Sequence, residues 1–290
     1  MTNEEFLTEA LASQDCPADF GETYGYFCGF QKIALDTLRA FVQVCDKNEI
    51  NYVLAFGSLL GAIRDGGQIP WDYDVDVVVP YTDKDKLVAA MDADLDSGYR
   101  FFAPGRDPGY RPSFIRVVPQ GYPHQMLHVD VFFAVGIPDD EPSRTGYCKD
   151  VRDRFRAHMF LVENLKEYPY SWKRKIKHVA MKEYYFIKYG KKAMGDNKDL
   201  FAKYPLENMK ETIILSSTVG KIIYPSKVFL ETAEHETRDG TFSIPADYET
   251  FFRIKYGDWE KYNPIGSRIA EVERHCADFR WYRDHDMIHV

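Results

Sequence analysis

The sequence predicts a mixed α/β fold, in which a sheet-containing core is followed by a mainly helical second half. Four apolar runs rich in β-branched or aromatic residues lie between about residues 51 and 136, bounded by Gly, Pro or polar residues. Apolar residues recur at helical spacing in segments beside these runs. After Pro142 the strand-like runs give way to polar and basic segments. A chain of 290 residues suits one large domain or two small ones.

The elements of the core follow from these patterns in chain order. Residues 29–48 carry a helical apolar stripe, and 51–56 (NYVLAF) are a predicted strand. Residues 57–67 begin with Gly-Ser and end with Gly-Gly, which leaves room for a helical turn or two. The other predicted elements are a strand at 74–79, a helix at 83–95, and strands at 114–119 and 128–136.

We divide the chain into a polar segment (1–28), expected to be irregular, a core (29–140), and a mainly helical part (141–290) that packs on the core and closes its cleft. Residues 267–286 are predicted to be helical. The segment 171–192 carries eight Lys or Arg residues and one acid. It is either the solvated face of a helix or a helix that docks on a membrane surface or an anionic glycan.

The composition excludes several classes of protein. A net charge of −8 argues against nucleic-acid binding, which usually needs a basic footprint. The five cysteines form no Cys-x-x-Cys pair, so a structural zinc site is not expected. The acidic N-terminus does not resemble a signal peptide, and no apolar run approaches about 18 residues. We therefore expect a cytoplasmic protein, with membrane contact limited to the peripheral kind.

Three aspartates alternate along the stretch IPWDYDVDVVVP (69–80). Because side chains alternate across a strand, Asp74 and Asp76 share one face, and Asp72 joins them if the strand extends back to it. Neighbouring carboxylates repel one another and raise each other's pKa, a conflict that a divalent cation removes. Hard oxygen ligands suit Mg²⁺ or Mn²⁺. An Asp-x-Asp pair alone is a weak signal, since exposed strand edges often carry one.

A fourth acid strengthens this interpretation. Asp130 is the only charged residue in the strand-like run HVDVFF. If its strand lies beside 74–79, Asp130 completes a cluster that can hold two metal ions, as in an in-line phosphoryl displacement. We therefore predict Asp74, Asp76 and Asp130 as catalytic residues. The predicted metal ligands are Asp72, Asp74, Asp76 and Asp130.

Phosphate-binding groups are predicted on both sides of this cluster. Gly57 follows a strand, where a glycine lets the backbone approach a phosphate, and Ser58 offers a hydroxyl and an N–H. Arg64 can contact a phosphate with two N–H groups. Arg116 lies on the strand before Asp130 and is either a phosphate partner or a structural residue. His124 and His128 flank Asp130 and either transfer protons or are structural.

The order of strand, Gly-Ser, cationic turn, Asp-x-Asp strand and distant strand Asp resembles the nucleotidyltransferase fold of DNA polymerase beta. More closely, residues 51–80 (NYVLAFGSLLGAIRDGGQIPWDYDVDVVVP) resemble the signature of the LicD/fukutin-related family. HVDVFF is similar to the family's second acidic strand, and residues 244–264 (IPADYETFFRIKYGDWEKYNP) to its C-terminal element. The resemblance covers about residues 30–264.

This resemblance implies a metal-dependent transferase of substituted phosphate groups. It would move phosphocholine, ribitol phosphate or glycerol phosphate from a CDP-linked donor to a hydroxyl of a glycan or lipid-linked glycan, and CMP would leave. Asp130 would also act as general base. Asp65 stands where the family often has a basic residue, and Tyr73 replaces an aspartate. Tyr256, Gly257 and Asp258 would close the cleft.

Two other classes stay open at the level of sequence. The same fold and acids could serve a transferase that uses ATP or a UDP-sugar. The chain could also be a binding module without catalysis, although carboxylates in a valine strand cost stability when nothing compensates them.

Overall fold

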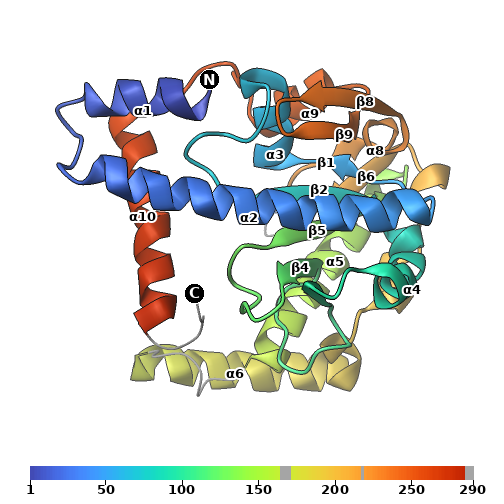
Figure 1. Cartoon of the computed structure of the whole chain (residues 1–290). Coiled ribbons are helices and arrows are strands. Elements are labelled where there is room, and N and C mark those ends of the chain that lie inside the picture. The colour runs from blue at the N-terminus through green and yellow to red at the C-terminus, as the bar shows by residue number, and fades with distance from the viewer. Residues whose placement is uncertain (164–170, 217–218, 285–290) are drawn as a thin grey trace.

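The computed structural model describes residues 1–163, 171–216 and 219–284. Its described part contains a seven-stranded mixed sheet with helices packed around it, and a separate two-stranded hairpin (Figure 1). A mixed α/β fold is therefore confirmed.

The main sheet brings the predicted strands together in the order β1–β2–β5–β4–β3. β2 pairs with β5 in parallel, and the other neighbours in this path pair antiparallel. The strands are β1 (Val53–Leu54), β2 (Val75–Pro80), β3 (Tyr99–Phe102), β4 (Ile115–Pro119) and β5 (Val129–Ile137). Three predicted strands agree with β2, β4 and β5 within a residue or so, the predicted 51–56 strand shortens to β1, and β3 was not predicted.

The second half holds more strand than expected. β6 (Glu211–Ile214) pairs with β5 and with β7 (Tyr224–Pro225), which extends the main sheet with chain from beyond residue 200. β8 (Thr232–Thr237) and β9 (Gly240–Pro245) form the hairpin. The Asp-Gly pair at the turn between β8 and β9 is an ordinary hairpin signal. By contrast, β6 is a short apolar run that becomes a strand because it pairs with the part of β5 that β4 leaves unpaired.

The expectation that the first 25 or so residues are irregular is wrong. Residues 3–11 form α1 (Asn3–Leu11), whose N-terminus is capped by reciprocal hydrogen bonds between Thr2 and Glu5. The helix predicted at 29–48 begins earlier, as α2 (Phe20–Lys47). The early turns form because burial of aromatic side chains stabilises them, which the local polarity of the segment hides.

The remaining helices agree with the sequence where it made a prediction, at 57–67, 83–95, 171–192 and 267–284, while residues 285 and 286 of the last predicted helix lie outside the described residues. They are α3 (Phe56–Leu60), a π-helical turn (Gly61–Asp65), a 3₁₀ turn (Tyr81–Asp83), α4 (Lys84–Asp94), α5 (Glu141–Val162), α6 (Trp172–Tyr189), a 3₁₀ turn (Gly190–Met194), α7 (Lys198–Phe201), a 3₁₀ turn (Leu206–Asn208), α8 (Lys227–Leu230), α9 (Tyr248–Lys255) and α10 (Ile265–Asp284). Among the described helices, none is long and apolar enough to cross a membrane.

A second hydrophobic core holds the loop that leads into β2. It joins α1, the start of α2 and α10 to residues 69–73, and Figure 1 shows α10 crossing α1 and α2. The Tyr24 hydroxyl donates to the Pro70 carbonyl at 2.9 Å. The Gln31 amide donates to the carbonyls of Ile69 and Asp72 at 2.9 and 2.8 Å. The N-terminal helices therefore fix the backbone that presents the first acid of the row.

Candidate active site

The three alternating aspartates form a row on one face of the chain. Asp72, Asp74 and Asp76 are each partly exposed, while the residues between them, Tyr73 and Val75, are buried. The strand itself begins at Val75, so the first two acids lie on the loop that leads into it. We call Asp72, Asp74, Asp76 and Asp130 together the acid row.

Strand register brings Asp130 beside this row. Asp76 on β2 is the register partner of Asp130 on β5, and Asp130 is also the partner of Arg116 on β4. Residues directly opposite each other in neighbouring strands project to the same face. Asp76, Asp130 and Arg116 therefore lie side by side across three strands, which places the predicted catalytic acids together.

Arg116 contacts Asp130 and not the open side of the row. Its Nε donates to Asp130 Oδ1 at 2.6 Å and its second terminal nitrogen to Oδ2 at 3.2 Å. Another nitrogen donates to the His124 carbonyl at 3.1 Å. Asp130 is 8% exposed, so this forked pair compensates a nearly buried carboxylate. The geometry favours the structural interpretation of Arg116 over a direct contact with phosphate.

The acid row is electrostatically strained. Burial raises the pKa of the Asp76 carboxyl well above its usual value, and the charge of Asp130 adds to this rise, followed by those of Asp74 and Asp72. Burial and then the charge of Asp74 raise the pKa of Asp72 to about 7. In the absence of a cation, part of the row is therefore protonated near neutral pH.

Replacing Asp72 with asparagine is expected to stabilise the metal-free protein increasingly as pH rises. The pKa of Asp72 is 3.8 when unperturbed and about 7 in the fold, so the folded state binds more protons between these values. The free energy of unfolding therefore falls as pH rises through this window. Asparagine does not titrate and can still accept the 3.1 Å hydrogen bond from the Asp74 N–H.

The measurement is the melting temperature of both proteins in chelator from pH 4.5 to 8. The melting temperature of the variant, relative to that of the wild type, should rise from low to high pH. This difference in melting temperature should level off above about pH 7. A difference that does not change with pH would show that Asp72 has an ordinary pKa.

Gly57 and Ser58 support the acid row directly. A Cβ on Gly57 would lie 2.9 Å from Asp72 Oδ2, so only a glycine lets this carboxylate lie so close to the backbone. The Ser58 hydroxyl accepts the Asp76 backbone N–H at 2.8 Å. Both residues were predicted to contact phosphate. The structure places them first as supports for Asp72 and Asp76.

The two histidines beside Asp130 are neutral. Burial lowers the pKa of His128 to about 3 and that of His124 to about 4, and the charge of Arg116 acts in the same direction. His128 Nε2 lies 3.4 Å from Asp130 Oδ1. Among the described residues, the Nδ1 atoms of both histidines have no hydrogen-bond partner. Neutral imidazoles in this position can orient a ligand without adding charge.

Arg64 is held by its neighbour. Its Nε and a terminal nitrogen donate to Asp65 Oδ2 at 3.1 and 2.9 Å, and the guanidinium stacks 4.5 Å from the ring centre of Tyr262. Asp65 also accepts the Tyr262 hydroxyl at 2.8 Å. The aspartate that departs from the family pattern therefore orients Arg64 and offsets its charge.

Sequence reasoning missed a cation near the acid row. Lys255, at the end of α9, has its Nζ 4.7 Å from the ring centre of Phe56. Burial lowers the pKa of Lys255, and the nearby charge of Asp76 opposes this. Next to it, burial and then the charges of Asp76 and Asp72 raise the pKa of the Tyr256 phenol. The signal was available, because both residues belong to the FRIKYGD stretch of the C-terminal motif.

Helix α10 lies beside the Asp72 end of the acid row, and its contact with the row was not predicted from the sequence. The His275 ring meets the Tyr73 ring edge-on, with 4.6 Å between centres. Glu271 is hydrogen-bonded to Arg274, and its charge contributes to the raised pKa of Asp72. Nothing in the pattern of 267–286 indicates this role, because it depends on where α10 crosses α2.

A cleft of about 500 Å³ opens beside Asp72. Tyr256 and Asp258 line it, and Gly257 between them has φ 72°, a backbone conformation that favours glycine. Its wall combines small, aromatic, cationic and other polar groups. The other lining residues are Gly57, Leu60, Arg64, Ile69, Trp71, Asp72, Trp259, Lys261, Asn263, Ser267, Arg268 and Glu271. The volume is in the range of small-molecule sites.

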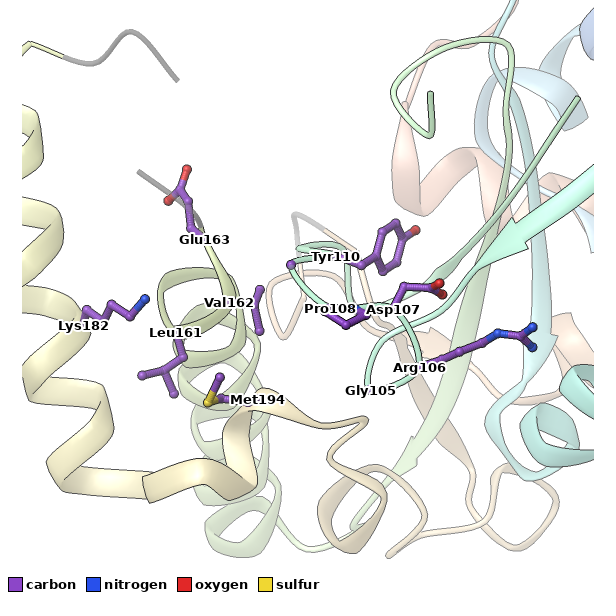
Figure 2. A pocket seen from close by; sticks show the side chains of 11 residues that line it. Gly105, Arg106, Asp107, Pro108, Tyr110, Leu161, Val162, Glu163, Lys182 and Met194 are labelled. Atoms are coloured by element: carbon purple, nitrogen blue, oxygen red, sulfur yellow. The ribbon is translucent and has the colours of Figure 1, made fainter. Parts of the chain in front are cut away.

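A second cavity, of about 590 Å³, lies elsewhere in the fold. Figure 2 shows it between the loop 105–110 and the end of α5, with Lys182 of α6 and Met194 at its border. None of the predicted site residues lines it within the described part of the chain. We therefore place the candidate active site at the acid row and the cleft beside Asp72.

A known protein family matches the part of the chain that carries the acid row. Residues 49–173 match the family model described as the nucleotidyltransferase domain of LicD/FKTN/FKRP, and this span contains the whole acid row. This part of the chain is similar to the LicD/fukutin-related family. Gly57, Ser58, Arg64 and Arg116 lie in the same span.

Two kinds of curated relative share short segments with the chain. It is 47% identical over 47 residues to lipopolysaccharide cholinephosphotransferase LicD of Haemophilus influenzae, which is 16% of this chain and 18% of that protein. It is 52% identical over 42 residues to ribitol 5-phosphate transferase FKRP of mouse and human, 14% of this chain and 8% of those proteins. The matched segments thus span less than a fifth of each relative.

Proposed function

We propose that this chain is a metal-dependent transferase that moves a phospho-alcohol from a CDP-linked donor to a hydroxyl of a glycan, with release of CMP. One observation carries the proposal: Asp76 and Asp130 stand in register on parallel neighbouring strands, beside Asp72 and Asp74, inside the segment that matches the family. The phospho-alcohol class is suggested by the names of the two relatives, which act on phosphocholine and ribitol 5-phosphate.

The sheet topology supports a nucleotidyltransferase fold of the DNA polymerase beta type. β1 is antiparallel to β2, the Gly57-Ser58 pair begins the short helix between them, and the second acidic strand is parallel to the first. This is the order of elements that the sequence resemblance implies.

The acid row fits Mg²⁺ or Mn²⁺ in its chemistry. Asp72, Asp74 and Asp76 offer hard oxygen ligands on a partly exposed face, and Asp130 would add a fourth carboxylate if two ions bind. The raised pKa values of Asp72 and Asp76 are what an uncompensated site produces. Within the described residues, no three metal-binding side chains are already arranged around one point, so the carboxylates would draw together on binding. The ion would supply positive charge to the donor's phosphate oxygens.

The donor is proposed to occupy the cleft beside Asp72. Cationic side chains at its wall, Arg64, Lys261 and Arg268, suit phosphates, and the Trp71 and Tyr256 rings offer faces for a base or a sugar. Each of these cations already has a carboxylate partner, Asp65 for Arg64, Asp258 for Lys261 and Glu9 for Arg268, so a phosphate would have to share or displace these pairs. The cleft opens beside the acid row, which would place the pyrophosphate next to the carboxylates.

In the proposed reaction, an acceptor hydroxyl oxygen attacks the phosphorus that carries the alcohol. The bond from this phosphorus to the bridging oxygen breaks, and CMP leaves with that oxygen. The hydroxyl proton passes to a carboxylate, for which Asp130 is the predicted base. Arg116 donates one hydrogen bond to each oxygen of Asp130, so the proton would have to reach a lone pair that Arg116 leaves free.

The Arg116–Asp130 pair also favours a second candidate, a binding module of the same fold without catalysis. A carboxylate that is fully paired needs no metal, and only the three aspartates before it would then carry uncompensated charge.

A donor screen separates the candidates. We would incubate the protein with CDP-choline, CDP-ribitol or CDP-glycerol, Mg²⁺ or Mn²⁺ and a panel of glycans, and detect CMP and the modified glycan by mass spectrometry. Metal-dependent CMP release with one CDP-alcohol is expected. Turnover of ATP or a UDP-sugar in its place would support the other transferase class. Thermal stabilisation by CDP without any turnover would support the binding module.

A further inference from the structure

Helix α6 exposes an apolar stripe on the face opposite to its packed face. His178 and Tyr185 are buried, against Phe160 of α5. On the other side, five large apolar residues fall within an arc of about 100° at the spacing of an α-helix. They are Trp172 (69% exposed), Ile176 (61%), Val179 (51%), Phe186 (46%) and Ile187 (83%).

Lysines border this stripe on both sides. By helical spacing, Lys173 and Lys177 follow one edge and Lys175 and Lys182 the other, and one acid, Glu183, lies within the stripe. Over 171–192 the charges sum to +7 (eight basic residues and one acid), in a chain whose net charge is −8. This helix and its continuation therefore carry a local excess of positive charge.

This pattern distinguishes a bilayer from other anionic surfaces. A glycan or nucleic acid would use the lysines and leave the isoleucine, valine and phenylalanine side chains in water. At a bilayer surface, the stripe enters the region between head groups and acyl chains. The lysine stems extend outward, so that their ammonium groups meet lipid phosphates. Tryptophan at one end of the stripe suits the same boundary.

We propose that α6 lies flat in the surface of an anionic lipid bilayer, with Trp172, Ile176 and Ile187 buried among the lipids. This goes beyond the proposed transferase activity and does not depend on it. Figure 1 shows α6 along the lower edge of the molecule, while β2 and α3 lie away from it, in the middle and upper part of the view. Binding through α6 therefore leaves the acid row accessible.

Vesicle flotation of the full chain tests the proposal. We expect binding to vesicles of phosphatidylcholine mixed with phosphatidylglycerol, weaker binding to pure phosphatidylcholine, and a loss of binding as salt increases. The double variant Ile176→Asp/Ile187→Asp should bind the mixed vesicles about tenfold less or weaker still. Lys175→Glu/Lys177→Glu should bind less at low salt and approach the wild type at high salt.

Leu11→Asp is the matched control, because Leu11 is an exposed apolar residue of α1 (56%) far from α6 in the sequence. It should bind vesicles like the wild type, and circular dichroism should show the same fold for all variants, since the changed side chains are exposed.

Three results would overturn the proposal. One is absence of binding to the anionic vesicles, and another is equal binding by the Ile176→Asp/Ile187→Asp variant. The third is a wild-type dimer in light scattering that this variant converts to a monomer without lipid. In that case the stripe is a contact between two copies of the chain.

Discussion

Replacing Asp76 with asparagine is expected to reduce CMP release by about a hundredfold or more while the protein stays folded. Asparagine keeps the size of the side chain, and the backbone N–H of residue 76 keeps its bond to the Ser58 hydroxyl. The change removes the carboxylate that stands in register with Asp130. The activity assay is the donor screen described above, run with the CDP-alcohol that gives turnover.

The same variant should melt at an equal or higher temperature than the wild type in chelator. In the wild type, burial and the other carboxylates of the acid row disfavour the negative charge of Asp76. Removing this charge therefore relieves repulsion. Added Mg²⁺ or Mn²⁺ should raise the melting temperature of the wild type and raise that of the variant less. Asp92→Asn is the control, because Asp92 is a half-exposed residue of α4 outside the site. Full activity in Asp76→Asn would refute the role of the acid row.

Replacing Arg116 with methionine should lower the free energy of unfolding by about 3–5 kcal/mol. Methionine preserves much of the side chain's bulk but removes the guanidinium group, whose two hydrogen bonds compensate the charge of Asp130. The side chains of Arg116 and Asp130 are 17% and 11% exposed, so water cannot replace the lost partner well. Urea unfolding at neutral pH would measure the change.

A second substitution identifies the cause. Adding Asp130→Asn to Arg116→Met should recover much of the lost stability, because the uncompensated charge is then gone. Arg106→Met is the control: Arg106 pairs with Asp92 at 2.6 Å, but the two side chains are 42% and 50% exposed. Its effect should be within about 1 kcal/mol. Equal losses in Arg116→Met and Arg106→Met would mean that the buried pair has no special importance.

The core elements were predictable because their signals are local. The alternation around Asp72, Asp74 and Asp76 predicts one partly exposed face, and the structure has it. The helix after residue 83 lies in a segment rich in helix-forming residues, and the strand around Asp130 is an apolar run that ends before Pro138. The short β6 was missed since its four residues form a strand only by pairing with β5 and β7, which lie elsewhere in the chain. The early turns of α2 were missed because aromatic packing outweighs their polarity.

Within the site, the sequence anticipated that Asp130 could lie beside Asp76, but other contacts between distant segments were not predicted. Arg116 pairs with Asp130 because of the register between β4 and β5, and no local sequence pattern predicts this register. Lys255 approaches Asp76 because α9 packs against α8 and the hairpin strand β9, with Phe251 on Phe56. Glu271 approaches Asp72 because α10 crosses α2. Gly57 was given a role toward phosphate, and the structure shows that it makes room for the Asp72 carboxylate.

The sequence by itself determined which residues carry charge into an apolar strand, the order of the motifs and the family that they resemble, because these depend only on residue type and spacing. The tertiary structure alone decided that Asp76 and Asp130 are neighbours, that Arg116 compensates Asp130, and that the N-terminal helices hold the loop before β2. Strand register and helix packing bring together residues that lie far apart in the chain. The charges therefore acquire their shifted pKa values only when the chain is folded.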